Sequence, residues 1–109
     1  MTKRTFTKYP SSYVKASRSV TKRYYVYYID NTDLQTNLLN AIISDALSKY
    51  DVRVNFGYRD SKSRSLGPDV CVCIIDAEKA IAKSKLKSII KDELDVDIVD
   101  IESEEFESF

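Results

Sequence analysis

The sequence has no histidine and no tryptophan, and it has only two glycines, two prolines and two cysteines in 109 residues. Without histidine the chain lacks the commonest general base and metal ligand, which counts against an enzyme or a zinc site. Scarce glycine and proline exclude a collagen-like chain and count against complete disorder. Cys71 and Cys73 stand two apart in an apolar run, which is unlike a disulfide framework. We expect a folded, cytoplasmic protein without catalytic residues, metal or cofactor.

Charge of one sign is missing from each end of the chain. No acidic residue precedes Asp30, and no basic residue follows Lys91. The formal net charge of zero therefore hides a positive beginning and a negative end. Nucleic acid, a membrane surface and the chain's own acidic end are the candidate partners of the positive part. We expect no membrane partner, because no apolar run approaches the roughly 20 residues that span a bilayer and the basic part lacks amphipathic periodicity.

The pattern of apolar residues predicts one domain between two polar ends. We interpret residues 1–22 as a flexible basic arm, residues 23–101 as the domain and residues 102–109 as an acidic tail. Alternating apolar residues predict strands, and apolar residues three or four apart predict helices. The expected elements are a strand over 23–30, a helix over 33–49, strands over 51–59 and 70–75, a helix over 77–94 and a strand over 96–101.

This βαββαβ order predicts an α+β fold, specifically a ferredoxin-like two-layer sandwich. The first and third strands are expected in the centre of the sheet, with both helices on one face. The run from Val70 to Ile75 is apolar at every position, as a strand buried on both faces is. We expect a hairpin through the polar stretch 60–68 to connect it with the second strand.

Local patterns predict where the helices begin and which sides are buried. Thr32 and Gln35 form a capping-box pattern, and Asp76 is placed to cap the second helix. The apolar residues at helical spacing in the first helix are Leu34, Leu38, Ile42, Ala46 and Tyr50. The alternating apolar residues of the second strand are Val52, Val54, Phe56 and Tyr58. An exposed basic stripe is expected on the second helix at Lys79, Lys83, Lys87 and Lys91.

Cations accompanied by aromatic side chains are the candidate binding residues. If the Val52 side of the second strand packs on the helices, Arg53 lies on the open face of the sheet, where Tyr25 and Tyr27 can stack bases. Phosphate contacts are expected from Lys3, Arg4, Lys8, Lys15, Arg18, Lys22, Arg23, Arg53, Arg59, Lys62 and Arg64. Because aromatics accompany the cations, single-stranded nucleic acid is favoured over duplex. The choice between DNA and RNA stays open.

An open sheet with aromatic side chains resembles the RNA-recognition motif in outline. Cys71 and Cys73 stand where that family has its stacking aromatics, so the resemblance does not extend to base-specific recognition. The alternative interpretation is that this face is a dimer interface, or that the basic arm covers it.

The acidic end resembles the Phe-terminated tails of bacterial and phage single-stranded DNA-binding proteins. The resemblance implies that a replication or host protein binds the tail through Glu104, Glu105, Phe106, Glu107 and Phe109. The proline often found before the terminal phenylalanine in the bacterial tails is missing here. Screening of the basic sites and simple solubilisation are the alternatives.

Carboxylates near strand ends raise the question of a magnesium site. The first strand, which ends in Asp30, resembles that of small CRISPR-associated nucleases with a ferredoxin-like fold, in which an aspartate ends that strand. Together with Asp33, Asp69 and Asp76, this residue could hold Mg²⁺. Aspartate is equally common at strand ends and helix caps without any metal, and no further motif of the family accompanies it.

Three functional hypotheses follow from these patterns. The leading one is a non-enzymatic nucleic-acid-binding accessory protein that grips phosphates with the arm and the loop after the second strand. The second is a viral or mobile-element inhibitor, of anti-CRISPR or anti-restriction type, whose acidic end binds a host nucleic-acid enzyme. The third is a virion or assembly component, a homo-oligomer whose arm ties subunits together.

Overall fold

The computed structural model describes residues 22–105, which form an α+β fold. The predicted arm up to Thr21 and the end of the predicted tail from Phe106 lie outside the described residues. In chain order the elements are β1 (Lys22–Ile29), α1 (Thr36–Ala46), the short 3-10 helix η1 (Ser48–Tyr50), β2 (Val52–Tyr58), α2 (Ser61–Leu66), β3 (Val70–Ala77), α3 (Lys83–Leu94) and β4 (Ile98–Glu105).

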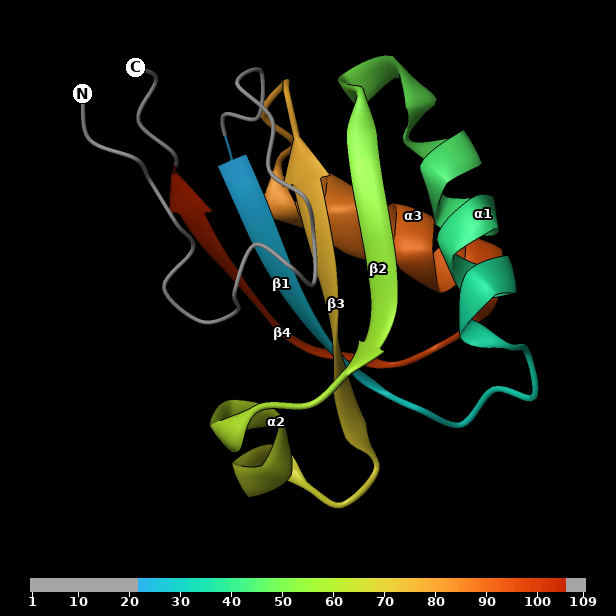
Figure 1. Cartoon of the computed structure of the whole chain (residues 1–109), viewed down its shortest axis with the longest axis vertical. Helices are drawn as coiled ribbons and strands as arrows, with labels where there is room; N and C mark the ends of the chain where they lie inside the picture. The colour runs from blue at the N-terminus through green and yellow to red at the C-terminus, as the bar shows by residue number, and fades with distance from the viewer. Residues whose placement is uncertain (1–21, 106–109) are drawn as a thin grey trace.

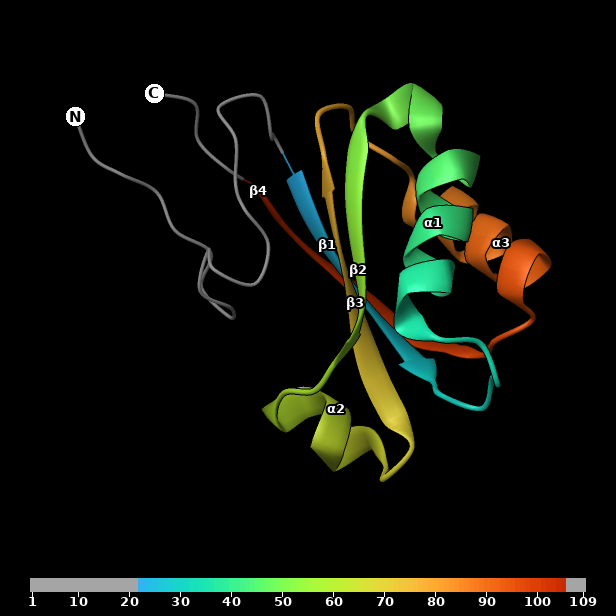
Figure 2. The ribbon, with the colours of Figure 1, turned by 45° about the vertical axis from the view of Figure 1, so that its right-hand side comes forward.

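The four strands form one antiparallel sheet in the order β2-β3-β1-β4. The first and third strands are central, which confirms the sequence prediction. Helices α1 and α3 cover one face, and α2 lies on the opposite side at one end of the sheet (Figures 1 and 2). This arrangement is compatible with a two-layer sandwich. Within residues 22–105 no helix is long and apolar enough to cross a membrane.

The central strands are apolar on both faces because their side chains alternate between two separate clusters. On one face Tyr24, Val26 and Tyr28 of β1 pack with α1 and α3 in the main core. The tyrosine hydroxyls satisfy backbone groups there, since Tyr24 donates to the carbonyl of Ile81 at 2.9 Å and Tyr28 accepts from the amide of Gly57 at 3.1 Å. The second cluster, on the opposite face, contains Tyr25, Tyr27, Val70, Val72 and Ile74.

The buried side of α1 differs in part from the predicted one. Leu39 and Ile43 face the core, and the predicted Ile42 and Tyr50 pack partly buried against it, whereas Leu34 and Leu38 are 41% and 46% exposed. The predicted capping box is also wrong, because the helix begins at Thr36 and its N-cap residue makes no side-chain cap bond.

For the second helix the sequence predicts a shared buried side of Ala82, Leu86, Ile89, Ile90 and Leu94. In α3 Leu86, Ile90 and Leu94 are buried and Ile89 packs partly buried against the same core, whereas Ala82 precedes the helix and is exposed.

The connection between β2 and β3 is not a simple hairpin. It contains α2, which begins with a capping box: the Ser63 amide donates to Asp60 Oδ1 at 2.7 Å and the Asp60 amide donates to Ser63 Oγ at 2.8 Å. Before it, the β2–β3 register shifts between Asn55 and Tyr58. This bulge turns Tyr58 away from the Val52 side, so that it packs with the second cluster and not, as predicted, with the main core.

The ends of two strands also differ from the prediction. β3 continues through Asp76 and Ala77, so Asp76 is a strand residue and does not cap α3, which begins at Lys83. β4 continues to Glu105, so residues 102–105 of the predicted tail form half of an edge strand. The acidic end is therefore partly built into the sheet.

Gly57 should be needed at the bulge. Its φ is +90°, and a Cβ added there would lie 2.8 Å from Thr36 Cγ2. We predict that Gly57→Ala lowers the free energy of unfolding by about 1–3 kcal/mol, measured by urea denaturation. Adding Thr36→Ser, which removes that methyl group, should restore the steric part of the loss. Unchanged stability of Gly57→Ala would contradict the strained backbone described for this bulge.

Candidate functional site

The side of the sheet opposite α1 and α3, here called the tyrosine face, carries the two predicted stacking residues. Tyr25 and Tyr27 are 1% and 0% exposed. Tyr25 donates its hydroxyl to Glu104 Oε2 at 2.8 Å, and Tyr27 donates to Asp60 Oδ2 at 3.0 Å. Desolvation and these carboxylates raise the pKa of both phenols, which keeps them as hydrogen-bond donors. In this arrangement neither ring presents a surface on which a base can stack.

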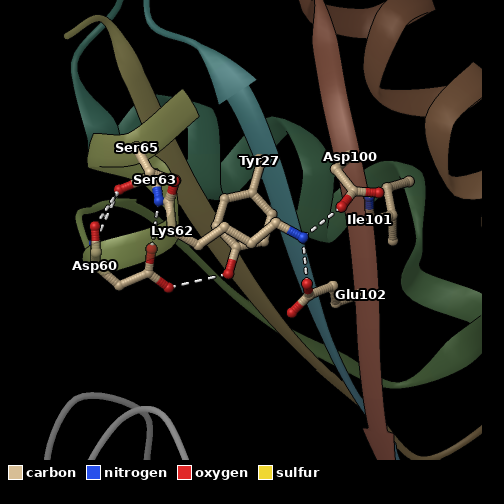
Figure 3. Close-up of polar contacts among 8 residues, drawn as sticks. All are labelled: Tyr27, Asp60, Lys62, Ser63, Ser65, Asp100, Ile101 and Glu102. Atoms are coloured by element: carbon tan, nitrogen blue, oxygen red, sulfur yellow. Dashed lines mark hydrogen bonds and ion pairs between the residues drawn. The ribbon is translucent and has the colours of Figure 1, made fainter. Parts of the chain in front are cut away.

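Lys62 of α2 is bound to β4, here called the acidic strand because it carries Asp100, Glu102 and Glu104, instead of being free for a phosphate (Figure 3). Its side chain crosses the ring of Tyr27, with Nζ 4.9 Å from the ring centroid, and its ammonium group pairs with Asp100 and Glu102 of β4. Hydrogen bonds to these two carboxylates raise the pKa of Lys62. The lysine therefore joins α2 to β4 across the tyrosine face.

Arg23, a predicted phosphate contact, is an interior residue. Its Nε donates to Asp76 Oδ1 at 2.7 Å and its Nη2 to Asp76 Oδ2 at 3.1 Å, and both side chains are 0% exposed. The two residues are opposite each other in the β1–β3 register. Burial raises the pKa of the Asp76 carboxyl, and the guanidinium opposes this shift. In such a bidentate pair the two buried charges compensate each other, so this arginine has a structural role.

A row of carboxylates borders the tyrosine face along β4. Asp100, Glu102 and Glu104 are paired with Tyr27, Tyr25 and Arg23 of β1. Alternate residues of a strand point to one side, about 6.8 Å apart, so the three carboxylates lie in line. The open basic surface predicted here is thus an apolar surface with an acidic border.

The other predicted binding residues are spread over the molecule. Arg53, Arg59 and Arg64 are exposed, and Arg59 Nη1 donates to the carbonyl of Pro68 at 2.7 Å. Lys22 Nζ lies 5.6 Å from the ring centroid of Tyr24. The remaining residues lie outside the described part: Lys3, Arg4, Lys8, Lys15, Arg18, Phe106, Glu107 and Phe109.

A basic cluster that the sequence did not predict surrounds Tyr50 at the end of η1. Lys49 Nζ is 5.2 Å and Lys85 Nζ is 6.0 Å from the centroid of the partly exposed ring. Lys79, in the loop after β3, donates its amide to the carbonyl of Tyr50 at 3.3 Å and its Nζ to the carbonyl of Lys49 at 3.4 Å. We call these four residues the Tyr50 cluster. Its lysines come from three separate segments.

The charges in the Tyr50 cluster act on its phenol. Desolvation acts to raise the pKa of Tyr50, but Lys85 and Lys49 outweigh it, and the pKa lies below its usual 10.0. One carboxylate lies beside the cluster: Asp51 Oδ2 is 3.8 Å from Lys79 Nζ. The cluster thus combines a partly exposed ring, which also packs against the main core, with a local excess of ammonium groups.

The predicted lysine stripe on the second helix is divided by the structure. Lys79 precedes α3 and belongs to the Tyr50 cluster, while Lys83 and Lys87 line a hollow between α3 and β4 with Ile98 and Val99. Lys91, at the end of α3, pairs with Asp97 at 3.0 Å and Asp95 at 3.3 Å.

The four aspartates proposed for magnesium do not meet. Asp30 donates its amide to the carbonyl of Asp69 at one end of β3, whereas Asp76 lies near the other end of that strand. In the described range 22–105 no group of three or more histidine, cysteine, aspartate or glutamate residues could hold a metal ion.

Comparisons with protein-family models, curated proteins and solved structures gave no match. The geometry of the tyrosine face, the acidic strand and the Tyr50 cluster is therefore the basis on which a function can be proposed.

Asp76→Asn tests the structural role of Arg23. Removing the carboxylate leaves a buried guanidinium without its compensating charge, so we predict a loss of about 3–5 kcal/mol in the free energy of unfolding. The double variant Arg23→Met with Asp76→Leu should lose much less, because neither charge remains in the interior. Urea denaturation measures both, with the exposed Arg64→Met as a control that changes stability by less than about 0.5 kcal/mol. An Asp76→Asn variant as stable as the original chain would contradict this role.

Proposed function

We propose that the protein binds nucleic acid without catalysing a reaction on it, and that the Tyr50 cluster is a contact surface. The observation that carries this proposal is the partly exposed ring of Tyr50 with the ammonium groups of Lys49 and Lys85 over it. A base can stack on an accessible aromatic ring, and flanking lysines can contact the adjacent phosphates. Lys79, whose Nζ donates to the carbonyl of Lys49, adds a third cation to the cluster.

Single-stranded nucleic acid suits this surface better than duplex. Stacking on Tyr50 requires an unpaired base, whereas a duplex offers only its phosphates to the lysines. The arm cations Lys3, Arg4, Lys8, Lys15 and Arg18 would add phosphate contacts that do not depend on sequence.

We infer that the scaffold is ferredoxin-like, with α2 as an addition between the second and third strands. The strand order and the placement of α1 and α3 support this inference.

The acidic strand favours a second candidate function. Asp100, Glu102 and Glu104 lie in line on an edge strand. A row of carboxylates can imitate the phosphates of a nucleic-acid backbone and bind in a basic groove. An inhibitor of this kind would bind a host nucleic-acid enzyme and ignore nucleic acid itself. The two candidates therefore differ in the first binding measurement.

We predict that the full chain binds labelled oligodeoxythymidine in fluorescence anisotropy, and that Tyr50→Leu raises the dissociation constant roughly 5- to 150-fold through loss of stacking. Tyr50→Phe, which keeps the ring, should bind like the original chain. Lys49→Gln with Lys85→Gln should reduce the slope of log K against log salt by about 1.4, since each phosphate contact on a single strand contributes about 0.7.

Lys91→Gln is the matched control, because Lys91 is already paired with Asp95 and Asp97. It should leave affinity and salt dependence unchanged. If neither the full chain nor a variant without residues 106–109 bound any oligonucleotide at low salt, the proposal would fail, and the inhibitor hypothesis would take its place.

A further inference from the structure

The tyrosine face is a deeply buried apolar surface of the sheet. Tyr25 is paired with Ile74 and Tyr27 with Val72 across the two central strands, and all four are at most 1% exposed. Among residues 22–105, the helix on this side is α2, which has six residues and lies at one end of the sheet (Figure 2). An apolar surface gains stability in proportion to the area that is removed from water. Side chains buried to this degree need more cover than one six-residue helix at the end of the sheet, so a further segment belongs on this face.

The cover can come from the same chain. Residues 1–21 join β1 directly at Lys22, next to the pair formed by Arg23 and Asp76 and away from α2. An extended segment of that length reaches roughly 70 Å, whereas an eight-residue strand is about 27 Å long. The segment is therefore long enough to cross the face and return. It supplies the apolar side chains Phe6, Tyr9, Tyr13, Val14 and Val20.

Charge complementarity favours the same occupant. Residues 1–21 hold five cations and no carboxylate. The tyrosine face is bordered by Asp60 on one side and by Asp100, Glu102 and Glu104 on the other. The described residues of this face carry fewer cations than carboxylates, and Lys62 is already paired with two of these carboxylates. A second copy of the domain would instead place acidic strands close to one another, which like charges oppose.

We propose that residues 1–21 pack over the tyrosine face of their own chain, with their aromatic side chains on the cluster of Tyr25 and Ile74 and their cations beside the acidic strand. The sequence predicts a flexible arm, with coverage of the sheet as the alternative. The apolar cluster of the tyrosine face and its acidic border favour that alternative. This proposal stands without nucleic-acid binding, because it depends only on the apolar cluster and the carboxylates around it.

Limited trypsin digestion of the full chain tests the proposal, because the cleavage sites of residues 1–21 are their five cations. At low salt we expect cleavage there to be about ten-fold slower or more than in a free peptide of the same sequence, since a packed segment is cut only when it opens. Phe6→Ser with Tyr9→Ser and Tyr13→Ser should abolish the protection while leaving the sequence of the folded domain unchanged.

A second variant tests the electrostatic part. Glu102→Gln with Glu104→Gln should increase cleavage of residues 1–21 several-fold, and the matched control Asp92→Asn with Glu93→Gln, on α3, should not. Thermal unfolding followed by circular dichroism verifies that the domain remains folded in each variant. Cleavage of the original chain at the rate of the free peptide would overturn the proposal. Protection that appears only with rising concentration and a dimer mass would also overturn it, by making a second copy the cover.

Discussion

The structure depends on the pairing of two central strands whose side chains are apolar on both sides. β1 and β3 are joined over eight residue pairs, from Lys22–Ala77 to Ile29–Val70. Because neither face of this pair can remain in water, one face must hold α1 and α3 and the other must be covered separately. The only buried charges among the described residues, those of Arg23 and Asp76, belong to the same pairing and compensate each other. The layers of the fold follow from this constraint.

The tyrosines of β1 connect the apolar pairing of the central strands with the charged residues around it. A buried phenol needs an acceptor, and the acceptors of Tyr25 and Tyr27 are carboxylates from β4 and from the start of α2. Lys62 then bridges α2 to β4. Residues that look in the sequence like a basic binding loop, a stacking surface and an acidic tail are therefore parts of one network. The accessible combination of ring and cation lies elsewhere, at Tyr50.

Features that repeat along the chain could be predicted, and features that depend on distant contacts could not. The aromatic and branched residues of β1 and the unbroken apolar run of β3 indicate the two central strands. The doublets Leu38–Leu39 and Ile42–Ile43 fit two helix faces about 100° apart equally well, so only packing selects Leu39 and Ile43. Tyr58 changes face because of a bulge at Gly57. The Tyr50 cluster comes from three segments with no common spacing, which leaves no periodic signal to find.

The two edges of the sheet bear on aggregation. An edge strand exposes unpaired backbone groups that can template pairing with another molecule. On β2 the bulge near Gly57 interrupts the regular ladder. On β4 the eight residues include Asp100, Glu102, Glu104 and Glu105, so two molecules joined antiparallel through this edge would bring carboxylates face to face. The acidic strand thus opposes the growth of the molecule into an extended sheet.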